Sequence, residues 1–203
     1  MAEWEQLANQ ESIERAVSAL RGNGFEVFVV ENGEEAKKKV FEKIPIGAEV
    51  MNMTSMTLET INVAKEIEDS NKFISIRKKL MAMRKPEPDH EMRCLGAAPE
   101  WAVGSVHAVT EDGHILIASK TGSQLPAYGY GAGRVIWVVG IQKIVKDTNE
   151  GIKRIYDCCL PLENERAKKA YGIESEVNKI LIVNKEIQKG RITIILVKEK
   201  LGF

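Results

Sequence analysis

Segments of strand length and segments of helix length alternate along the first third of the chain. Residues 3–21 place apolar side chains three and four positions apart, which predicts a helix, and residues 25–30 (FEVFVV) form an apolar run of strand length. The same order repeats with a helix after Gly33 that ends before Pro45, and then a strand over 48–53. Because a strand–helix–strand order builds parallel sheets through right-handed crossovers, we expect an α/β fold.

The second half of the chain adds strands of a different kind. Residues 101–109 and 114–119 flank Asp112-Gly113, a dipeptide typical of hairpin turns, which predicts an antiparallel pair. Residues 135–139 (VIWVV) are apolar at every position, as expected for a central parallel strand with both faces covered. We therefore expect a mixed, mainly parallel sheet in a single domain over residues 1–203. The remaining expected elements are a helix through 58–64 capped by Thr54-Ser55, a helix over 75–85, a loop at 86–88, a short helix through 92–95 capped by Asp89, a helix over 148–159, an exposed helix at 162–172, and strands over 179–183 and 191–197.

Charge and hydropathy argue against two classes of partner. The chain has 29 Lys and Arg residues and 29 Asp and Glu residues, so it has no net basic field and we expect no nucleic-acid binding. No apolar run reaches the about 18 residues that a membrane-spanning helix needs, and the N-terminal residues do not resemble a signal peptide. We expect a protein of the cytoplasm that makes no membrane contact.

The three cysteines are Cys94, Cys158 and Cys159, without any CxxC spacing. An adjacent pair would close only a strained disulfide ring, so we expect reduced thiols and a packing role for Cys158 and Cys159. Ligation of zinc or of an iron–sulfur cluster normally uses paired cysteine motifs. We therefore expect no metal and no cofactor bound by this chain alone.

Two segments leave an expected strand through small hydroxyl residues, and ligands bind at the carboxyl ends of strands in open α/β sheets. If the strands over 48–53 and 114–119 are parallel, the two loops open onto one edge. Ser123 is an expected N-cap with Pro126 in the first turn, and helix N-termini favour carboxylates and phosphates. A tight turn with a structural cap remains the alternative, and the loop matches neither the GxGxxG nor the P-loop pattern. The substrate-binding candidates are Thr54, Ser55, Lys120, Thr121, Gly122, Ser123 and Gln124.

Three residues are candidates for catalytic chemistry. His107 lies within an expected strand, where it could face a crevice or satisfy a hydrogen bond in the core. Lys143 follows the apolar strand over 135–139, which suits the binding of an anionic substrate, although a solvated loop lysine fits equally well. Glu111 lies at the expected hairpin turn and would act as a base or nucleophile only if the turn folds over the site. The charged residues Glu163, Glu165 and Arg166 are expected on a solvated helix face or at an interface.

The block from Gly104 to Ile155, with TGSQLP and VVGIQKIV as its most specific parts, resembles the signature of the LUD-domain family, the lactate-utilisation family. The resemblance continues through LPLENERAKKAYG and GRITIILVKEKLGF, and it therefore covers the whole chain in the form of a stand-alone, single-domain branch. It implies a three-layer Rossmann-like sandwich similar to the ribose-phosphate isomerase and CoA-transferase fold.

The resemblance also implies a link to the oxidation of L-lactate to pyruvate by a system of several subunits that contains iron–sulfur clusters. This chain lacks the cysteine runs of the cluster-bearing member, so an iron–sulfur partner protein would have to carry the electrons. We expect a small anionic metabolite as ligand at the loop over 120–134. An independent isomerase-like or CoA-transferase-like enzyme using Glu111, and a non-catalytic assembly or binding protein, remain alternatives, as does a homo-oligomer.

Overall fold

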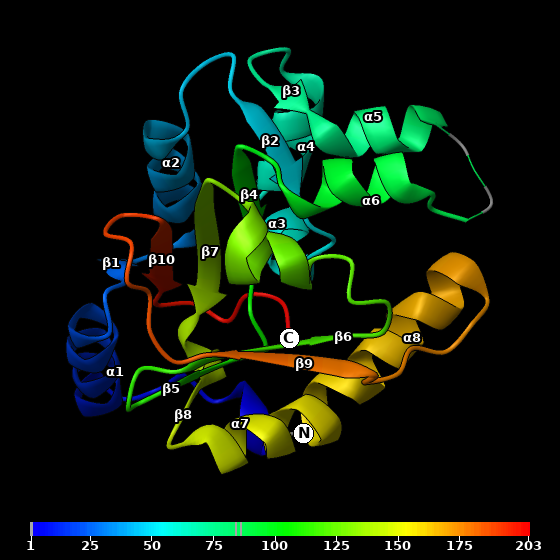
Figure 1. Ribbon diagram of the computed structural model, residues 1–203. Helices are drawn as coiled ribbons and strands as arrows, with labels where there is room; N and C mark the ends of the chain where they lie inside the picture. Colours follow the sequence, from blue (N-terminus) through cyan, green and yellow to red (C-terminus); the bar gives the residue numbers. More distant parts are fainter. Residues whose placement is uncertain (1, 84, 86) are drawn as a thin grey trace.

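The computed structural model describes residues 2–83, 85 and 87–203, and these residues form two sheets (Figure 1). The large sheet contains only parallel pairings, and the small sheet combines parallel and antiparallel pairings. In the described residues the order of the large sheet is β1 (Glu26–Val30), β10 (Ile192–Val197), β7 (Arg134–Gly140), β4 (Trp101–Gly104), β2 (Glu49–Asn52) and β3 (Ile74–Ser75). That of the small sheet is β8 (Ile144–Val145), β5 (Ala108–Thr110), β6 (Ile115–Ser119) and β9 (Lys179–Val183).

Helices and the small sheet cover the two faces of the large sheet. One face packs against α2 (Gly33–Lys43), α3 (Met56–Thr60) and α4 (Val63–Asp69). The other face packs against α1 (Gln10–Gly22) and the inner face of the small sheet. The expected α/β class and the three-layer Rossmann-like arrangement are therefore confirmed, with the antiparallel pairings confined to the small sheet. The remaining elements are η1 (Ala2–Glu5), α5 (Ile76–Met83), α6 (His90–Ala97), η2 (Ala127–Gly131), η3 (Ile141–Lys143), α7 (Thr148–Arg154), η4 (Ile155–Cys159) and α8 (Leu160–Tyr171).

The outer face of the small sheet is covered by one long helical segment. This segment consists of α7, the π-helical turn η4 and α8, and Figure 1 shows it running beneath β6 and β9. Ile155 and Cys158 from η4 pack against Ala108 of β5 and Leu116 of β6. β6 is thus buried on both faces, which explains why it is apolar at successive positions.

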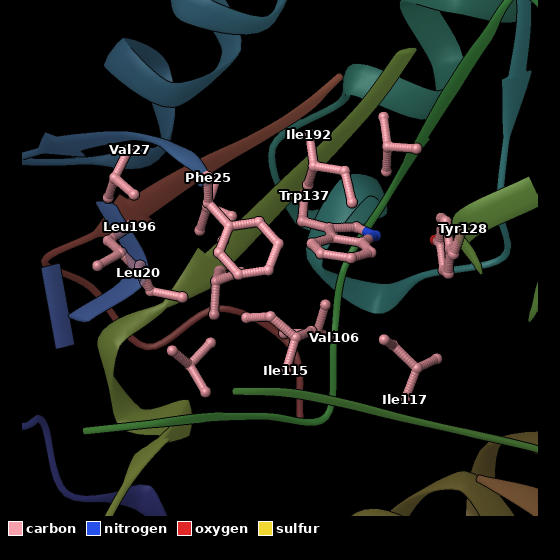
Figure 2. Close-up of a cluster of buried hydrophobic side chains, with 14 of the residues drawn as sticks. Leu20, Phe25, Val27, Val106, Ile115, Ile117, Tyr128, Trp137, Ile192 and Leu196 are labelled. Carbon is pink, nitrogen blue, oxygen red and sulfur yellow. The ribbon is translucent and has the colours of Figure 1, made fainter. Parts of the chain in front are cut away.

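Trp137 of β7 is the largest fully buried side chain among the described residues. It lies on the face of the large sheet that meets the small sheet, near Ile115 and Ile117 (Figure 2). Its ring meets Tyr128 edge-on, with 5.3 Å between the ring centroids and an interplanar angle of 85°. Ile136 and Val138 alternate to the opposite face, so the strand buries both of its faces as the sequence predicts.

The expected strand over 101–109 is the main difference from the sequence prediction. The chain leaves the large sheet after Gly104 and enters the small sheet at Ala108, so two strands of different sheets replace one. The hairpin is confirmed, since β5 and β6 pair antiparallel and Gly113 adopts a left-handed φ of 84° at the turn. The segment from Ser105 to His107 therefore crosses from one sheet to the other.

Two sequence expectations extend onto residues that the structure does not describe. The helix expected over 75–85 is observed at Ile76–Met83, whereas Arg84 lies outside the described residues. The loop expected at 86–88 includes Pro86, which also lies outside them.

We expect Gly104→Ala to destabilise the fold by about 1–3 kcal/mol, the typical cost of overpacking a core. A Cβ at Gly104 would overlap the Tyr128 hydroxyl, and Tyr128 is held in place by Trp137. Urea unfolding measures the change in free energy. Gly96→Ala is the matched control, because its Cβ would have ordinary contacts in α6 and should stabilise the helix by roughly 0.5–1 kcal/mol. Equal effects of the two changes would contradict this prediction.

Candidate functional site

One cavity of about 400 Å³ lies where the carboxyl ends of β2, β4, β7 and β6 approach α8. Strand-end loops of both sheets form one side of it, and η4 with α8 forms the other. This position agrees with the rule that ligands bind beyond the carboxyl ends of the strands in α/β sheets. The polar residues that line the cavity are Thr54, Ser55, Thr57, Ser105, His107, Ser119, Lys120, Thr121, Ser123, Gln124, Tyr128, Lys143, Cys159, Glu163, Arg166, Tyr171, Glu174, Ser175 and Glu176.

Lys143 is the most unusual of these residues, because its side chain is buried without a charged partner. It ends η3, directly after the central strand β7, and is only 1% exposed. Its Nζ donates to Thr57 Oγ1 at 3.1 Å, Ser105 Oγ at 3.1 Å and the Val106 carbonyl at 3.2 Å. All three acceptors are neutral, so none of the hydrogen bonds to this ammonium group comes with a counter-charge.

Burial changes the proton affinity of Lys143, and the adjacent thiols of Cys158 and Cys159 oppose this change only in part. Burial, together with the positive charge of Arg154, lowers the pKa of Lys143 from 10.5 to about 7. A lysine with this pKa exchanges its proton near neutral pH. An anion that entered the cavity would favour the charged form and would raise the pKa again.

His107 lines the same cavity as a neutral imidazole. Burial and the positive charges of Lys143 and Arg154 lower its pKa to about 3. Its Nδ1 accepts a hydrogen bond from the Ala118 amide at 3.1 Å, which leaves the ring proton on Nε2. His107 is therefore suited to donating a hydrogen bond at neutral pH and unsuited to delivering a proton from an imidazolium.

The loop over 120–124 contributes Lys120, Thr121, Ser123 and Gln124 to the cavity wall, while Gly122 adopts a left-handed φ of 84°. The expected N-cap at Ser123 is wrong. The following helical turn η2 is a five-residue π-helix that begins at Ala127, and Ser123 hydrogen-bonds to Thr121 instead. This loop therefore does not provide the helix N-terminus that was expected to bind an anion.

The substrate-binding candidates Thr54, Ser55 and Lys120 also line the cavity. Ser55 in addition caps α3 by accepting from the Leu58 amide. The loop after β2 and the loop after β6 line the same cavity. The sequence analysis expected this only if the two strands were parallel, but β6 belongs to the small sheet and β2 to the large one. Lys120 spans the mouth, where its Nζ donates to the Glu174 carbonyl at 2.6 Å.

Glu111 lies away from the cavity. Its carboxylate receives two hydrogen bonds from Arg15 of α1, at 2.7 and 3.0 Å. The hydrogen bond from Arg15 keeps the pKa of Glu111 below its usual value despite partial burial. The structure therefore does not bring Glu111 together with His107 and Lys143, and it ties the hairpin turn to α1.

η4 and α8, which form one side of the cavity, contribute residues that were not expected at a site from the sequence. Glu163 and Arg166, expected on a solvated face or an interface, line the cavity as an ion pair with two contacts of 2.7 Å. Cys159, expected to be a packing residue, also lines it. The residue spacing in α8 gave no signal for this, because only the fold reveals which helix covers the strand ends.

Neither a cluster nor a metal ion fits the side chains described here. No group of three or more His, Cys, Asp or Glu residues in the described part of the chain is arranged to hold a metal ion. Cys94 lies on α6, away from the adjacent pair Cys158 and Cys159. Among residues 2–83, 85 and 87–203, no helix has the length and apolar character that crossing a membrane requires.

Comparison with known proteins places the chain in a family. No curated protein matches it. A DUF162 family protein from Deinococcus radiodurans, known from its crystal structure, has a similar fold with a TM-score of 0.59 at 12% identity. The similarity covers 95% of this chain and 99% of that protein, and at this identity it shows the fold alone. The family model of the LUD domain matches residues 13–197, nearly the whole sequence. The chain therefore belongs to the LUD-domain family.

Proposed function

We propose that this protein binds a small carboxylate in the cavity, as a component or relative of the L-lactate oxidation system that does not itself carry a cluster. The observation that carries the proposal is Lys143, which lines the cavity as a buried lysine with neutral acceptors only. A buried charge without a counter-charge is costly, and an entering anion would reduce that cost.

The groups around Lys143 favour a carboxylate with a neighbouring hydroxyl or carbonyl oxygen. His107 offers an Nε2 proton, and the hydroxyls of Thr54 and Ser123 donate or accept hydrogen bonds at the same wall. A cavity of about 400 Å³ is within the usual range of small-molecule sites. Lactate and pyruvate carry this combination of groups and would fit with room to spare.

Oxidation of lactate to pyruvate removes two electrons, which need an acceptor. The described side chains contain no arrangement for a metal centre, so we propose that an iron–sulfur partner protein takes the electrons. In this view the chain binds and orients the substrate in the cytoplasm, and its own residues exchange protons but not electrons.

A thermal-shift screen of the purified protein against lactate, pyruvate, sugar phosphates and CoA esters tests the proposal. A ligand at ~100 times its Kd should stabilise the fold by roughly 2.7 kcal/mol, because it binds only the folded state. For a chain of this length that corresponds to an increase in Tm of a few degrees. We expect the increase for lactate or pyruvate, and we expect Lys143→Met to abolish it.

Lys146→Met is the matched control, since Lys146 is an exposed lysine three residues further along the chain. It should retain the whole shift. A shift of equal size in Lys143→Met would place the anion elsewhere, and no shift with any of these anions would contradict the proposed function.

A further inference from the structure

A second buried cation lies behind the cavity wall. Arg154, the last residue of α7, is 1% exposed. Its NH1 group donates to the His107 carbonyl at 2.5 Å and to Cys159 Sγ at 3.0 Å, and its Nε has no hydrogen-bond partner among the described residues. A fully buried guanidinium normally pairs with a carboxylate. Here the group in reach that can become negative is the thiol of Cys159.

The adjacent thiols share a proton in the field of Arg154. The Cys159 thiol donates a hydrogen bond to the Cys158 sulfur, and this bond, assisted by Arg154, lowers the pKa of Cys158 to about 6. The same hydrogen bond, with burial, raises the pKa of Cys159. At neutral pH the pair therefore shares one proton, and the Arg154 contact with Cys159 Sγ at 3.0 Å favours the negative charge on Cys159 when that proton lies on Cys158.

The two sulfurs face different surroundings. Cys159 lines the cavity with Lys143 and His107, whereas Cys158 packs into the apolar cluster of Trp4, Ala108 and Leu116. The π-helical turn Ile155–Cys159 brings about this arrangement, and π-helical turns are frequent at functional sites. Cys159 is thus the thiol that a ligand in the cavity would meet.

We propose that Cys159 is a nucleophile that adds to the carbonyl carbon of a small anionic ligand in this cavity, with Cys158 as its base. The inference rests on the proposed function for the negative charge of the ligand. Its own basis is the Arg154 contact with the Cys159 sulfur and the position of that sulfur at the cavity wall.

The addition needs neither an oxidant nor a leaving group. The Cys159 thiol proton moves to Cys158 as the bond between Cys159 Sγ and the carbonyl carbon forms. The π electrons of the carbonyl move to its oxygen, and the proton held by Cys158 returns to that oxygen through solvent. The product is a thiohemiketal, which re-forms the free carbonyl compound when the steps reverse. Arg154 stabilises the charge that develops on the Cys159 sulfur.

Alkylation of the native protein at pH about 7 by iodoacetate and by iodoacetamide tests the inference, because both reagents are small and differ in charge. The S–C bond forms and iodide leaves in each case. Mass spectrometry of the peptides gives the rate at each cysteine, with exposed Cys94 as the internal reference. We expect the ratio of the iodoacetate rate to the iodoacetamide rate to be on the order of tenfold higher at Cys159 than at Cys94, because nearby positive charge attracts the anion.

Three further measurements address the base and the carbonyl group. Cys158→Ser should slow alkylation of Cys159 at neutral pH by at least about tenfold and move its pH profile upward, since the base is lost. Pyruvate should protect Cys159 more than lactate, which has the same charge but no carbonyl. A carbon NMR signal of pyruvate labelled at its carbonyl carbon should show a tetrahedral carbon in the wild type and none in Cys159→Ser.

The outcomes separate this inference from the proposed function. A Cys159 that reacts with neither reagent in the folded protein, or reaction at Cys158 instead, would overturn the inference, and the Lys143-dependent thermal shift would be unaffected. Rapid alkylation of Cys159 without any preference for iodoacetate would support the nucleophile and count against an anion site. Equal protection by pyruvate and lactate would refute addition to the carbonyl.

Discussion

Replacing Lys143 by methionine is expected to remove a large contribution of one side chain to the pH dependence of stability above pH about 7. The pKa of Lys143 falls from 10.5 to about 7 on folding, first through burial and then through the charge of Arg154. At about 1.4 kcal/mol for each pKa unit, burying this charge costs about 5 kcal/mol below pH 7. Between pH about 7 and about 10 the unfolded chain binds more protons than the folded one, so the stability of the wild type rises with pH. Lys143→Met should lack this rise.

Urea unfolding of both proteins across this pH range gives the difference in free energy directly. Cys158 adds a slope of the same sign because its pKa is lowered, and Cys159 adds one of the opposite sign at higher pH because its pKa is raised, so only the difference between wild type and variant isolates Lys143. We expect Lys143→Met to be at least as stable as the wild type near neutral pH, because it removes a buried charge whose hydrogen-bond acceptors are all neutral. A difference that stays constant with pH would show that Lys143 keeps an ordinary pKa.

The sequence predicted a large part of the cavity, because strand ends are visible in a pattern of apolar and polar residues. Thr54, Ser55, Lys120 and Thr121 follow expected strands, and the fold brings them to one cavity. Lys143 follows from the same reasoning, since VIWVV is a recognisable central strand. The rule concerning the carboxyl ends of strands was therefore sufficient to find these residues, even though one of the strands belongs to a second sheet.

The burial of Lys143 and the role of Cys159 could not be predicted in the same way. Thr57, Ser105 and Val106, which hold the Lys143 ammonium, come from two segments far from Lys143 in the sequence. Local periodicity contains no information about such contacts. Cys159 shows the same limit, because its surroundings depend on η4 and α8 packing over strand ends that precede them by tens of residues.

Arg191 illustrates a residue whose structural role the sequence pattern concealed. It was expected only as the first residue of the last strand. In the structure it is 5% exposed, and its guanidinium forms an ion pair with Glu186 at 2.7 Å. It also donates to the carbonyls of Ala127, Tyr128 and Ala132, which lie in the glycine-rich segment over 122–133.

Arg191→Met is therefore expected to destabilise the protein by about 3–5 kcal/mol, the usual cost of removing one partner from a buried ion pair. The change leaves the Glu186 carboxylate, whose side chain is only 10% exposed, without its cation, and it removes one hydrogen bond from each of three carbonyls. The double variant Arg191→Met/Glu186→Gln should lose less than the sum of the single changes, because the unpaired carboxylate is then absent. Urea unfolding of the four proteins gives this coupling energy, and a cost below about 1 kcal/mol for Arg191→Met would contradict the prediction. Since Tyr128 lines the cavity, the ligand-induced thermal shift should decrease in Arg191→Met, which would link the stability of the glycine-rich segment to binding at Lys143.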